Sequence, residues 1–363
     1  STFHWIETPH CQYIFYIKTM SNATTQGVYL STPTQDLFTW PSGHPLYNGP
    51  GEGTFLSQYH EFFMDVRVPI TSAAVYATSV HICNRIRKTN KEPLAISKTA
   101  FFRWFVLLHN IGLCVYSAWT FIGMTSGISK TVYEISNSSQ NAGSLLVATK
   151  GSNFWRSLCD TNEGIWDKSL SFYGYYFYLS KFYEVFDTII ILAKGRQSSL
   201  LQTYHHAGAM LSMWAGVRYA SPPIWIFVVF NSLIHTIMYF YYTISALKVP
   251  VPRILKRALT TAQICQFVFG GSFALMHGFI NYFNATSGEY CSCLDTPGKL
   301  FALAFNVSYL APLTYLFVMF WIDSYVRGWK KGAQPQVPAK EQVIKTAQQP
   351  SKDVSARTRS KKA

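Results

Sequence analysis

The sequence has little charge for its length. Only 13% of its 363 residues are Asp, Glu, Lys or Arg, whereas soluble domains carry roughly 25%. Seven cysteines are too few for a disulfide-rich scaffold, and an aromatic content of 17% excludes disorder for most of the chain. The 31 basic and 17 acidic residues give a net charge of +14, which would be typical of a nucleic-acid-binding protein. Here the positive charge lies between long apolar runs, so the composition indicates a membrane protein and no nucleic-acid partner.

Apolar runs long enough to cross a bilayer occur at seven places. A bilayer core about 30 Å thick needs about 20 mostly apolar residues in a helix. The run that contains His205 and His206 is the most polar, and the first run, which contains His81, is also weak. The sequence predicts an all-α polytopic membrane protein with spans at about 67–84, 101–124, 170–193, 198–216, 222–246, 255–278 and 300–326.

Charge alternates between the connections of these spans. The connections on one side sum to +19, whereas those on the other side are nearly neutral. Because cytosolic loops carry an excess of Lys and Arg, we expect the N-terminus in the lumen and the C-terminus in the cytosol. The tail ends with Lys361 and Lys362, which approximates a dilysine retrieval signal of the endoplasmic reticulum, although a solvated basic tail near anionic lipid explains it equally well. The expected organisation is a lumenal segment (1–60), a seven-helix membrane domain (61–330) and a disordered basic cytosolic tail (331–363).

Two further signals agree with this sidedness. Glycosylation sequons begin in the near-neutral regions at Asn22, Asn137 and Asn284, whereas the one at Asn306 lies inside a span and is expected to be chance. Four cysteines also fall on that side, where an oxidising lumen permits a disulfide. They are Cys11, Cys159, Cys291 and Cys293, and we expect Cys159 to pair with either Cys291 or Cys293.

Ionisable side chains inside the spans are costly in lipid and are therefore functional candidates. The third span contains Lys181, Glu184 and Asp187 at steps of three, which places them on one broad helical face. A structural salt-bridge ladder between helices is the alternative interpretation. Three titratable groups at this depth exceed what packing usually requires.

Polar residues also follow helical spacing in the next three spans. Gln202 lies three and four residues before His205 and His206. At 1.5 Å per residue, the polar groups of four spans reach a similar depth in the cytosolic half. We therefore expect one internal site, with an apolar tunnel on its lumenal side. The polar residues that the fifth and sixth spans contribute to this site are Asn231, His235, Tyr239, Tyr242, Gln263 and Gln266.

Clustered histidines in a membrane serve two chemistries. A di-iron oxidase or desaturase needs more imidazoles than the three that converge here, since His81 and His109 are isolated in the sequence. A single zinc ion on His205, His206 and His235 would have enough ligands, but adjacent histidines on a helix point about 100° apart. Acyl transfer is the other chemistry, because a neutral imidazole attacks thioesters and the acyl-imidazole survives where water is excluded. We therefore expect no metal.

Four motifs in order carry a family resemblance. They are Lys181-x-x-Glu184-x-x-Asp187-Thr188, Gln202-x-x-His205-His206, Asn231-x-x-x-His235-x-x-Met238-Tyr239-x-Tyr241-Tyr242 and Thr260-x-x-Gln263-x-x-Gln266. Over about 60–330 the chain resembles the elongase family of very-long-chain fatty acids, the membrane 3-oxoacyl-CoA synthases. Family members usually have HxxHH, and the glutamine at 202 is similar to fungal and other microbial forms.

The resemblance implies an enzyme of the endoplasmic reticulum in which six helices form an inverted barrel around an acyl tunnel, with one peripheral helix. The implied reaction joins a long-chain acyl-CoA to malonyl-CoA and gives 3-oxoacyl-CoA, CO2 and CoA, without a cofactor. The implied partners are membrane lipid and the keto-reductase, dehydratase and enoyl reductase of the cycle, and the resemblance leaves room for a homodimer.

The resemblance also assigns roles to residues. His205 accepts the acyl group beside His235, while His206 and Gln202 orient imidazoles or polarise the thioester. The charged trio of the third span holds the charges of the site, and the polar residues of the fifth and sixth spans contact substrate. Cytosolic basic residues would bind CoA phosphates; they are Lys194, Arg196, Lys248, Arg253, Lys256 and Arg257.

A seven-helix receptor or transporter is the competing class. A retinal-type lysine inside the last helix is missing, because Lys299 lies at the lumenal edge of the span, and the halves lack the symmetry of transporter repeats. If the chain is an enzyme, its chain-length preference should depend on bulky side chains at the lumenal end of the tunnel. The candidates lie near Phe279, Tyr282 and Phe301.

Overall fold

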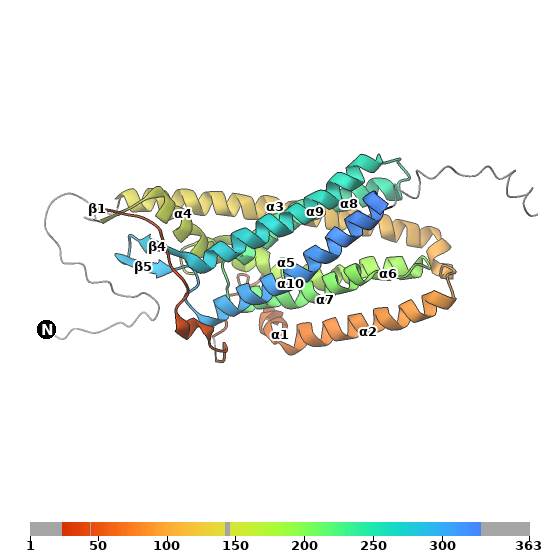
Figure 1. The fold of residues 1–363 in the computed structure, drawn as a ribbon, viewed down its shortest axis with the longest axis horizontal. Coiled ribbons are helices and arrows are strands. Elements are labelled where there is room, and N and C mark those ends of the chain that lie inside the picture. Colours follow the sequence, from red (N-terminus) through yellow and green to blue (C-terminus); the bar gives the residue numbers. More distant parts are fainter. Residues whose placement is uncertain (1–23, 44, 142–145, 328–363) are drawn as a thin grey trace, which may run out of the picture. The chain divides into compact units, whose positions relative to one another are not determined.

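Every range predicted as a span is mainly helical in the computed structural model, which describes residues 24–43, 45–141 and 146–327. The chain divides into two units, 1–318 and 319–363, and each is considered by itself. Figure 1 shows the long helices of the first unit running beside one another. These are α2 (Arg67–Thr89), α3 (Ala100–Asn141), α5 (Ser171–Tyr183), α6 (Val185–Ala193), α7 (Leu200–Arg218), α8 (Ile224–Ala246), α9 (Arg253–Met276) and α10 (Pro297–Trp321).

Four of these helices are long and apolar enough to cross a membrane. Within the described part of the chain they cover Ala100–Ser138, Ile224–Ala246, Arg253–Phe279 and Pro297–Arg327. Large apolar side chains such as Phe101 and Leu108 on α3 are mostly exposed, and exposed apolar surface of this extent is typical of contact with lipid. The chain is therefore a membrane protein, and the predicted all-α class agrees with its mainly helical structure.

The packing of the helices places the third predicted span inside the first unit. Helix α3 packs along α8, α2 along α7, and both α7 and α8 contact α5. The third span is not one helix, because α5 ends at Tyr183 and α6 begins at Val185. Glu184 lies at this junction.

Short elements gather at one end of the helices, where β4 and β5 meet α4 (Lys150–Cys159) in Figure 1. An antiparallel sheet joins β2 (Tyr29–Leu30), β4 (Ile280–Asn284) and β5 (Glu289–Ser292), with Tyr29 opposite Asn281 and Tyr282 opposite Cys291. A parallel pair joins β1 (Thr24–Gln26) to β3 (Leu146–Ala148). The turn between β4 and β5 contains Gly288 at φ 75°, a conformation that side chains disfavour. None of these strands was predicted from the sequence.

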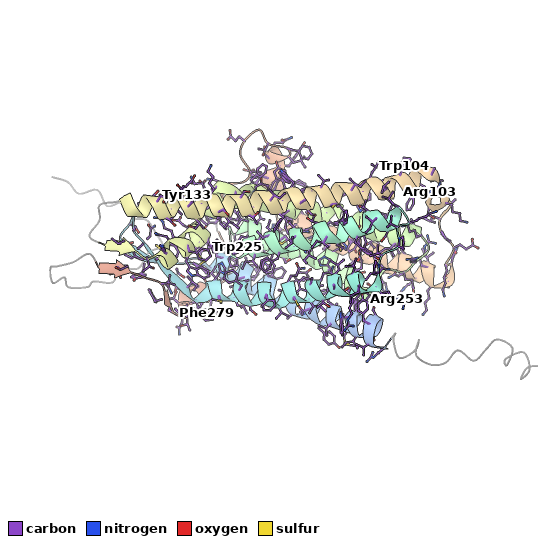
Figure 2. All side chains as sticks on the ribbon, turned by 90° about the horizontal axis from the view of Figure 1, so that it is seen from above. Arg103, Trp104, Tyr133, Trp225, Arg253 and Phe279 are labelled. Atoms are coloured by element: carbon purple, nitrogen blue, oxygen red, sulfur yellow. A yellow bond between two sulfur atoms is a disulfide. The ribbon has the colours of Figure 1, made fainter. Side chains whose placement is uncertain are left out.

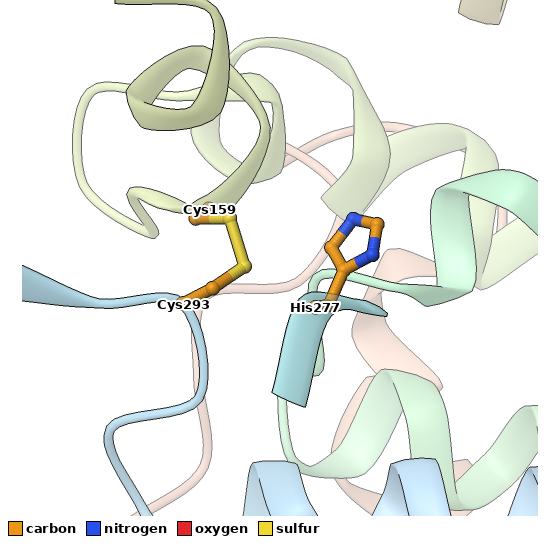
Figure 3. A group of neighbouring side chains, drawn as sticks. All are labelled: Cys159, His277 and Cys293. Carbon is orange, nitrogen blue, oxygen red and sulfur yellow. A yellow bond between two sulfur atoms is a disulfide. The ribbon is translucent and has the colours of Figure 1, made fainter. Parts of the chain in front are cut away.

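A disulfide between described residues connects this end of the molecule. It joins Cys159, at the end of α4, to Cys293, just after β5, and Figure 3 shows His277 beside it. Of the two partners predicted for Cys159, Cys293 is therefore the one that the structure has. His277 lies in the short helix η5 (His277–Phe279) and is fully buried.

The N-terminal segment is anchored to the core by aromatic side chains. Short helices occur in it at Gln35–Phe38 (η1), Ser57–Tyr59 (η2) and His60–Met64 (α1). The hydroxyls of the buried Tyr175 and Tyr178 donate to the backbone carbonyls of Leu56 and Phe63 at 3.0 Å each, and the indole of Trp214 donates to Met64 at 2.9 Å. Such contacts between distant segments leave no local pattern, which explains why no element was predicted here.

The remaining described elements are short. They are η3 (Ala95–Lys98), which precedes α3, η4 (Trp166–Leu170), which leads into α5, and η6 (Ile322–Arg327), which lies in the second unit. Within that unit the guanidinium of Arg327 donates to Asp323 at 2.6 Å.

Candidate active site

The break between α5 and α6 presents a buried ion pair. Lys181 Nζ lies 2.7 Å from Glu184 Oε1, and each side chain is only 3% exposed. The same Nζ donates to Asn231 Oδ1 of α8 at 3.2 Å, and the hydroxyl of Ser180 donates to Glu184 Oε1 at 3.0 Å. A buried charge pair is tolerated only when further hydrogen bonds satisfy it. The cross-helix contact with Asn231 therefore fixes the α5–α6 junction against α8.

Asp187 belongs to a second network and not to this pair. Its Oδ1 lies 3.0 Å from Nε2 of His109 on α3, and its Oδ2 accepts the hydroxyl of Tyr239 at 2.6 Å. Because a carboxylate only accepts hydrogen bonds, His109 donates from Nε2, and its Nδ1 faces the hydroxyl of Tyr183 at 3.3 Å. The expectation that His109 is isolated is wrong: its side chain is fully buried and paired with the carboxylate.

Two imidazoles from different helices approach Glu184. Each of Glu184, His205 and His235 offers one ligand atom within 4.8 Å of the other two. The rings of His205 on α7 and His235 on α8 have their centres 6.4 Å apart. His235 also packs edge-on against Tyr239 at 5.5 Å, so the Asp187 network supports one face of this imidazole.

His206 is directed into a separate chain of hydrogen bonds. Its Nε2 lies 2.9 Å from Gln202 Nε2, so the amide donates and the imidazole accepts. The same amide lies 3.4 Å from Thr188 Oγ1, which is 2.8 Å from the hydroxyl of Tyr76 on α2. Gln202 thus connects His206 to α6 and α2.

Tyr309 of α10 determines which nitrogen of His205 carries hydrogen. The tyrosine hydroxyl donates to the backbone carbonyl of His205 at 3.0 Å and lies 3.1 Å from His205 Nδ1. A hydroxyl has one hydrogen, and the carbonyl contact uses it, so Nδ1 must donate to the tyrosine oxygen. His205 Nε2 therefore keeps a free lone pair. Sequence reasoning missed Tyr309, because it belongs to none of the four motifs.

A cavity begins at these groups and continues between the helices. It has a volume of about 50 Å³, below the roughly 300–1,000 Å³ of typical small-molecule sites, so it is a narrow space between closely packed side chains. Lys181, His205, Asn231 and Tyr309 lie in its wall, together with Gln266, whose buried Oε1 has no hydrogen-bond partner among the described residues. The rest of the wall is mostly apolar: Phe177, Ala209, Ser212, Met213, Ile226, Phe227, Phe230, Phe267, Gly270, Asn306, Leu310 and Leu313.

Several predicted contact residues lie outside this wall. Gln263 donates to the sulfur of Met238 at 3.7 Å, and Tyr242 is 40% exposed beside Tyr239. The three candidates for chain-length selection do not line the cavity either. Phe279 is partly exposed, Tyr282 is buried in β4, and Phe301 packs against an aromatic ring of the N-terminal segment.

The six predicted phosphate-binding residues are all exposed. Lys194 and Arg196 follow α6, Lys248 precedes α9, and the other three lie in the first turns of α9. Partial desolvation of its ammonium group, and then the neighbouring Arg196, lower the pKa of Lys194. Figure 2 shows Arg253 and Arg103 at one end of the helices and Tyr133 and Phe279 at the other. Lys256 and Arg257 follow Arg253 by three and four residues, so the three basic residues lie on the same side of α9.

The sequons differ in their surroundings. Asn284 lies at the end of β4, where its Oδ1 accepts the backbone N–H of Thr286, and Asn137 lies near the end of α3. The buried Asn306 donates to the carbonyls of Ser212 and Ala302, which agrees with the expectation that its sequon is chance. Asn22 lies outside the described residues.

The fold and the site together define a helical membrane protein in which clustered imidazoles lie inside the helices and one of them, His205, lines a mostly apolar cavity. The chain belongs to the ELO: GNS1/SUR4 family, whose model matches residues 61–333. The family resemblance drawn from the four motifs is thereby confirmed.

Individual relatives are similar over much of the chain. Fatty acid elongase 2 of Trypanosoma brucei brucei is 25% identical over 69% of this chain and 83% of the relative. Fatty acid elongase A of Dictyostelium discoideum is 26% identical over 72% and 84%. Long chain fatty acid elongase 1 of Caenorhabditis elegans is 31% identical over 46% and 57%. No solved structure matches the chain.

Proposed function

We propose that this protein is the condensing enzyme of fatty acid elongation, a 3-oxoacyl-CoA synthase that joins a long-chain acyl-CoA to malonyl-CoA. Membership of the family and relatives named as fatty acid elongases support a role in fatty acid elongation. The specific reaction is supported by one observation. Nε2 of His205 has a free lone pair, and His205 lies in the wall of a mostly apolar cavity. A nucleophile in the wall of a mostly apolar cavity suits acyl transfer, because an apolar lining disfavours water beside a reactive acyl-imidazole.

In the proposed mechanism, Nε2 of His205 attacks the thioester carbonyl carbon of the acyl-CoA. The carbon–sulfur bond breaks, the CoA thiolate leaves and takes a proton from solvent, and an acyl-imidazolium remains. Its Nδ1–H stays bonded to Tyr309, where the free enzyme already has this contact. Malonyl-CoA then loses CO2, and the resulting enolate attacks the acyl carbon. The carbon–nitrogen bond breaks, which releases 3-oxoacyl-CoA and restores neutral His205.

The other predicted residues have supporting roles in this proposal. His235 lies beside the acyl acceptor, while His206 and Gln202 orient the α7 imidazoles. Lys181, Glu184 and Asp187 balance the charges, and no metal or cofactor is required. The remaining assignments are contacts with substrate by Asn231, Tyr239, Tyr242, Gln263 and Gln266, and contacts with CoA phosphates by Lys194, Arg196, Lys248, Arg253, Lys256 and Arg257.

The proposal includes an arrangement in the endoplasmic reticulum membrane. All seven predicted spans cross, six form the barrel around the acyl tunnel, and the N-terminus is lumenal. Sequons at Asn22, Asn137 and Asn284 then face the glycosylation machinery, and the cytosolic site exchanges intermediates with the reductases and dehydratase of the cycle. The alternation of charge between connections supports this orientation.

Expression in an elongase-deficient host tests the proposal. Membranes that contain the chain should incorporate labelled malonyl-CoA into 3-oxoacyl-CoA with an acyl-CoA between C14 and C24, without effect of iron chelation or anaerobiosis. Absence of product with every acyl-CoA in this range would exclude the reaction. Loss of activity on iron chelation would instead favour the di-iron class. Labelled acyl-enzyme formed by a His205→Ala variant would refute the covalent step.

A further inference from the structure

Three of the buried side chains also form a potential metal-binding set. We propose that Glu184, His205 and His235 reversibly capture a divalent cation of the zinc type. The capture would block acyl transfer, and only this inhibitory consequence rests on the proposed function. The set comes from three separate parts of the chain: the α5–α6 junction, α7 and α8.

The spacing of the three groups is close to that of a zinc site. Their ligand atoms all lie within 4.8 Å of one another, and Glu184 Oε2 is 3.9 Å from His235 Nδ1. Zinc bonds to nitrogen and oxygen are about 2.0–2.2 Å long, so two ligand atoms of a tetrahedral ion lie about 3.4 Å apart. Movements of less than about 1 Å would thus bring all three atoms onto one ion. Two imidazoles and one carboxylate are an established zinc-binding set with an open fourth position.

Two independent observations support a cation at this point. Glu184 is 3% exposed, and its Oε2 has no hydrogen-bond partner among the described residues. An unpaired buried carboxylate oxygen is costly, and a bound cation would satisfy it. In addition, His205 donates its Nδ1–H to Tyr309. A metal-binding imidazole needs such a partner on its second nitrogen, because that contact fixes the tautomer and directs the lone pair at the ion.

The charges nearby explain why the capture should be reversible. Lys181 Nζ already donates a hydrogen bond to Glu184 Oε1 at 2.7 Å, so the positive charge of the lysine opposes a cation on the other carboxylate oxygen. Asp187 lies one helical turn further along and adds negative charge. The resulting site is weaker than a permanent metal centre, in which no cation competes for the carboxylate.

A second group of ligand atoms in the described residues is equally close but is already used. It consists of Cys159, His277 and Cys293, and its two sulfur atoms form the disulfide in Figure 3. Both nitrogens of His277 are also occupied, by the carbonyl of Phe273 and the indole of Trp225. A cation should therefore select the Glu184 site.

Cobalt(II) alone serves as the probe, because its visible absorption reports tetrahedral nitrogen and oxygen ligands. The full-length protein in lipid nanodiscs should develop this absorption on titration, and Zn²⁺ should displace it. Glu184→Gln, which keeps the side-chain shape, should abolish the band, and so should His235→Gln. Tyr309→Phe should weaken Co²⁺ affinity about 10–100-fold, the usual effect of removing an outer hydrogen-bond partner. His81→Ala removes an exposed histidine of α2 and is the control that should bind normally.

Acyl-enzyme formation provides the second readout. Zn²⁺ should prevent labelling of the protein by acyl-CoA, and EDTA should restore it. The proposal is overturned if the folded protein gives no tetrahedral band, or if both substitutions, in protein of normal melting behaviour, leave the band unchanged. If the band behaves as expected but no acyl-CoA ever labels the protein, the metal site stands and the proposed function fails.

Discussion

Replacement of Tyr309 by phenylalanine tests the assignment of the reactive nitrogen. The substitution removes the hydroxyl that accepts His205 Nδ1–H at 3.1 Å and donates to the His205 carbonyl at 3.0 Å. A buried donor left without a partner costs about 1–3 kcal/mol. The tautomer with hydrogen on Nε2, which cannot attack a thioester, is then no longer disfavoured. If the whole cost appears in the barrier to acylation, the rate falls between about 5-fold and about 150-fold.

The assay is single-turnover labelling of the enzyme by radioactive acyl-CoA without malonyl-CoA. It separates acylation from decarboxylation and condensation. Tyr204→Phe is the matched control, because the Tyr204 ring stacks on Tyr309 and its hydroxyl donates to the backbone carbonyl of Tyr309 and not to the imidazole of His205. We expect this control to acylate within about 2-fold of the parent rate, since the lost hydrogen bond is neutral and does not involve the His205 ring. A Tyr309→Phe enzyme that acylates at the parent rate, or an equal loss in both variants, would refute the tautomer argument.

Three further substitutions probe the networks around the site and the lumenal end. Lys181→Met leaves a buried carboxylate unpaired and should lower the free energy of unfolding by about 3–5 kcal/mol, measured by thermal unfolding in detergent; a Tm equal to the parent's would contradict the pairing. His109→Phe removes a charge-assisted hydrogen bond from Asp187 and should lower the free energy of unfolding by about 2 kcal/mol. Condensation should also be slower, because Tyr239 then supports His235 less firmly. Unchanged stability and an unchanged rate would exclude the network. Replacement of both Cys159 and Cys293 by alanine opens a loop of 134 residues and should cost about 2–5 kcal/mol, whereas alanine at the exposed, unpaired Cys265 should have no effect on Tm.

The sequence predicts the site within each helix better than between helices. Spacing by three and four residues correctly placed Lys181 beside Glu184 and Gln202 beside His206. The same spacing predicted that Asp187 would join Lys181 and Glu184 in one ladder. This prediction is wrong, because the helix breaks at Glu184. Spacing within one segment contains no information about the neighbouring helix that a side chain will meet. The partnership of Asp187 with His109, which lies 78 positions earlier, follows only from the packing of the folded chain.

Hydropathy likewise predicts where a helix meets lipid better than where it ends. The second span was expected to stop at residue 124, where hydroxyl and charged side chains begin, but α3 continues to Asn141. A helix that leaves the bilayer needs no apolar run to continue, because its backbone hydrogen bonds are internal. The N-terminal strands were missed for a related reason. Strands of two or three residues such as β2 are specified by their partner β4, and no alternation of that length is detectable.

The division of the buried acids into two networks explains how the site combines charge with a neutral nucleophile. If Glu184 and Asp187 shared one cluster with the imidazoles, their combined field would favour protonation of His205, and a protonated imidazole cannot attack a thioester. Instead Lys181 neutralises Glu184, and His109 with Tyr239 satisfies both oxygens of Asp187. The second acid is thus held one turn away, and Tyr239 contacts both its carboxylate and the ring of His235. His205 donates its Nδ1–H to a neutral phenol, so the protein fixes its tautomer without adding charge.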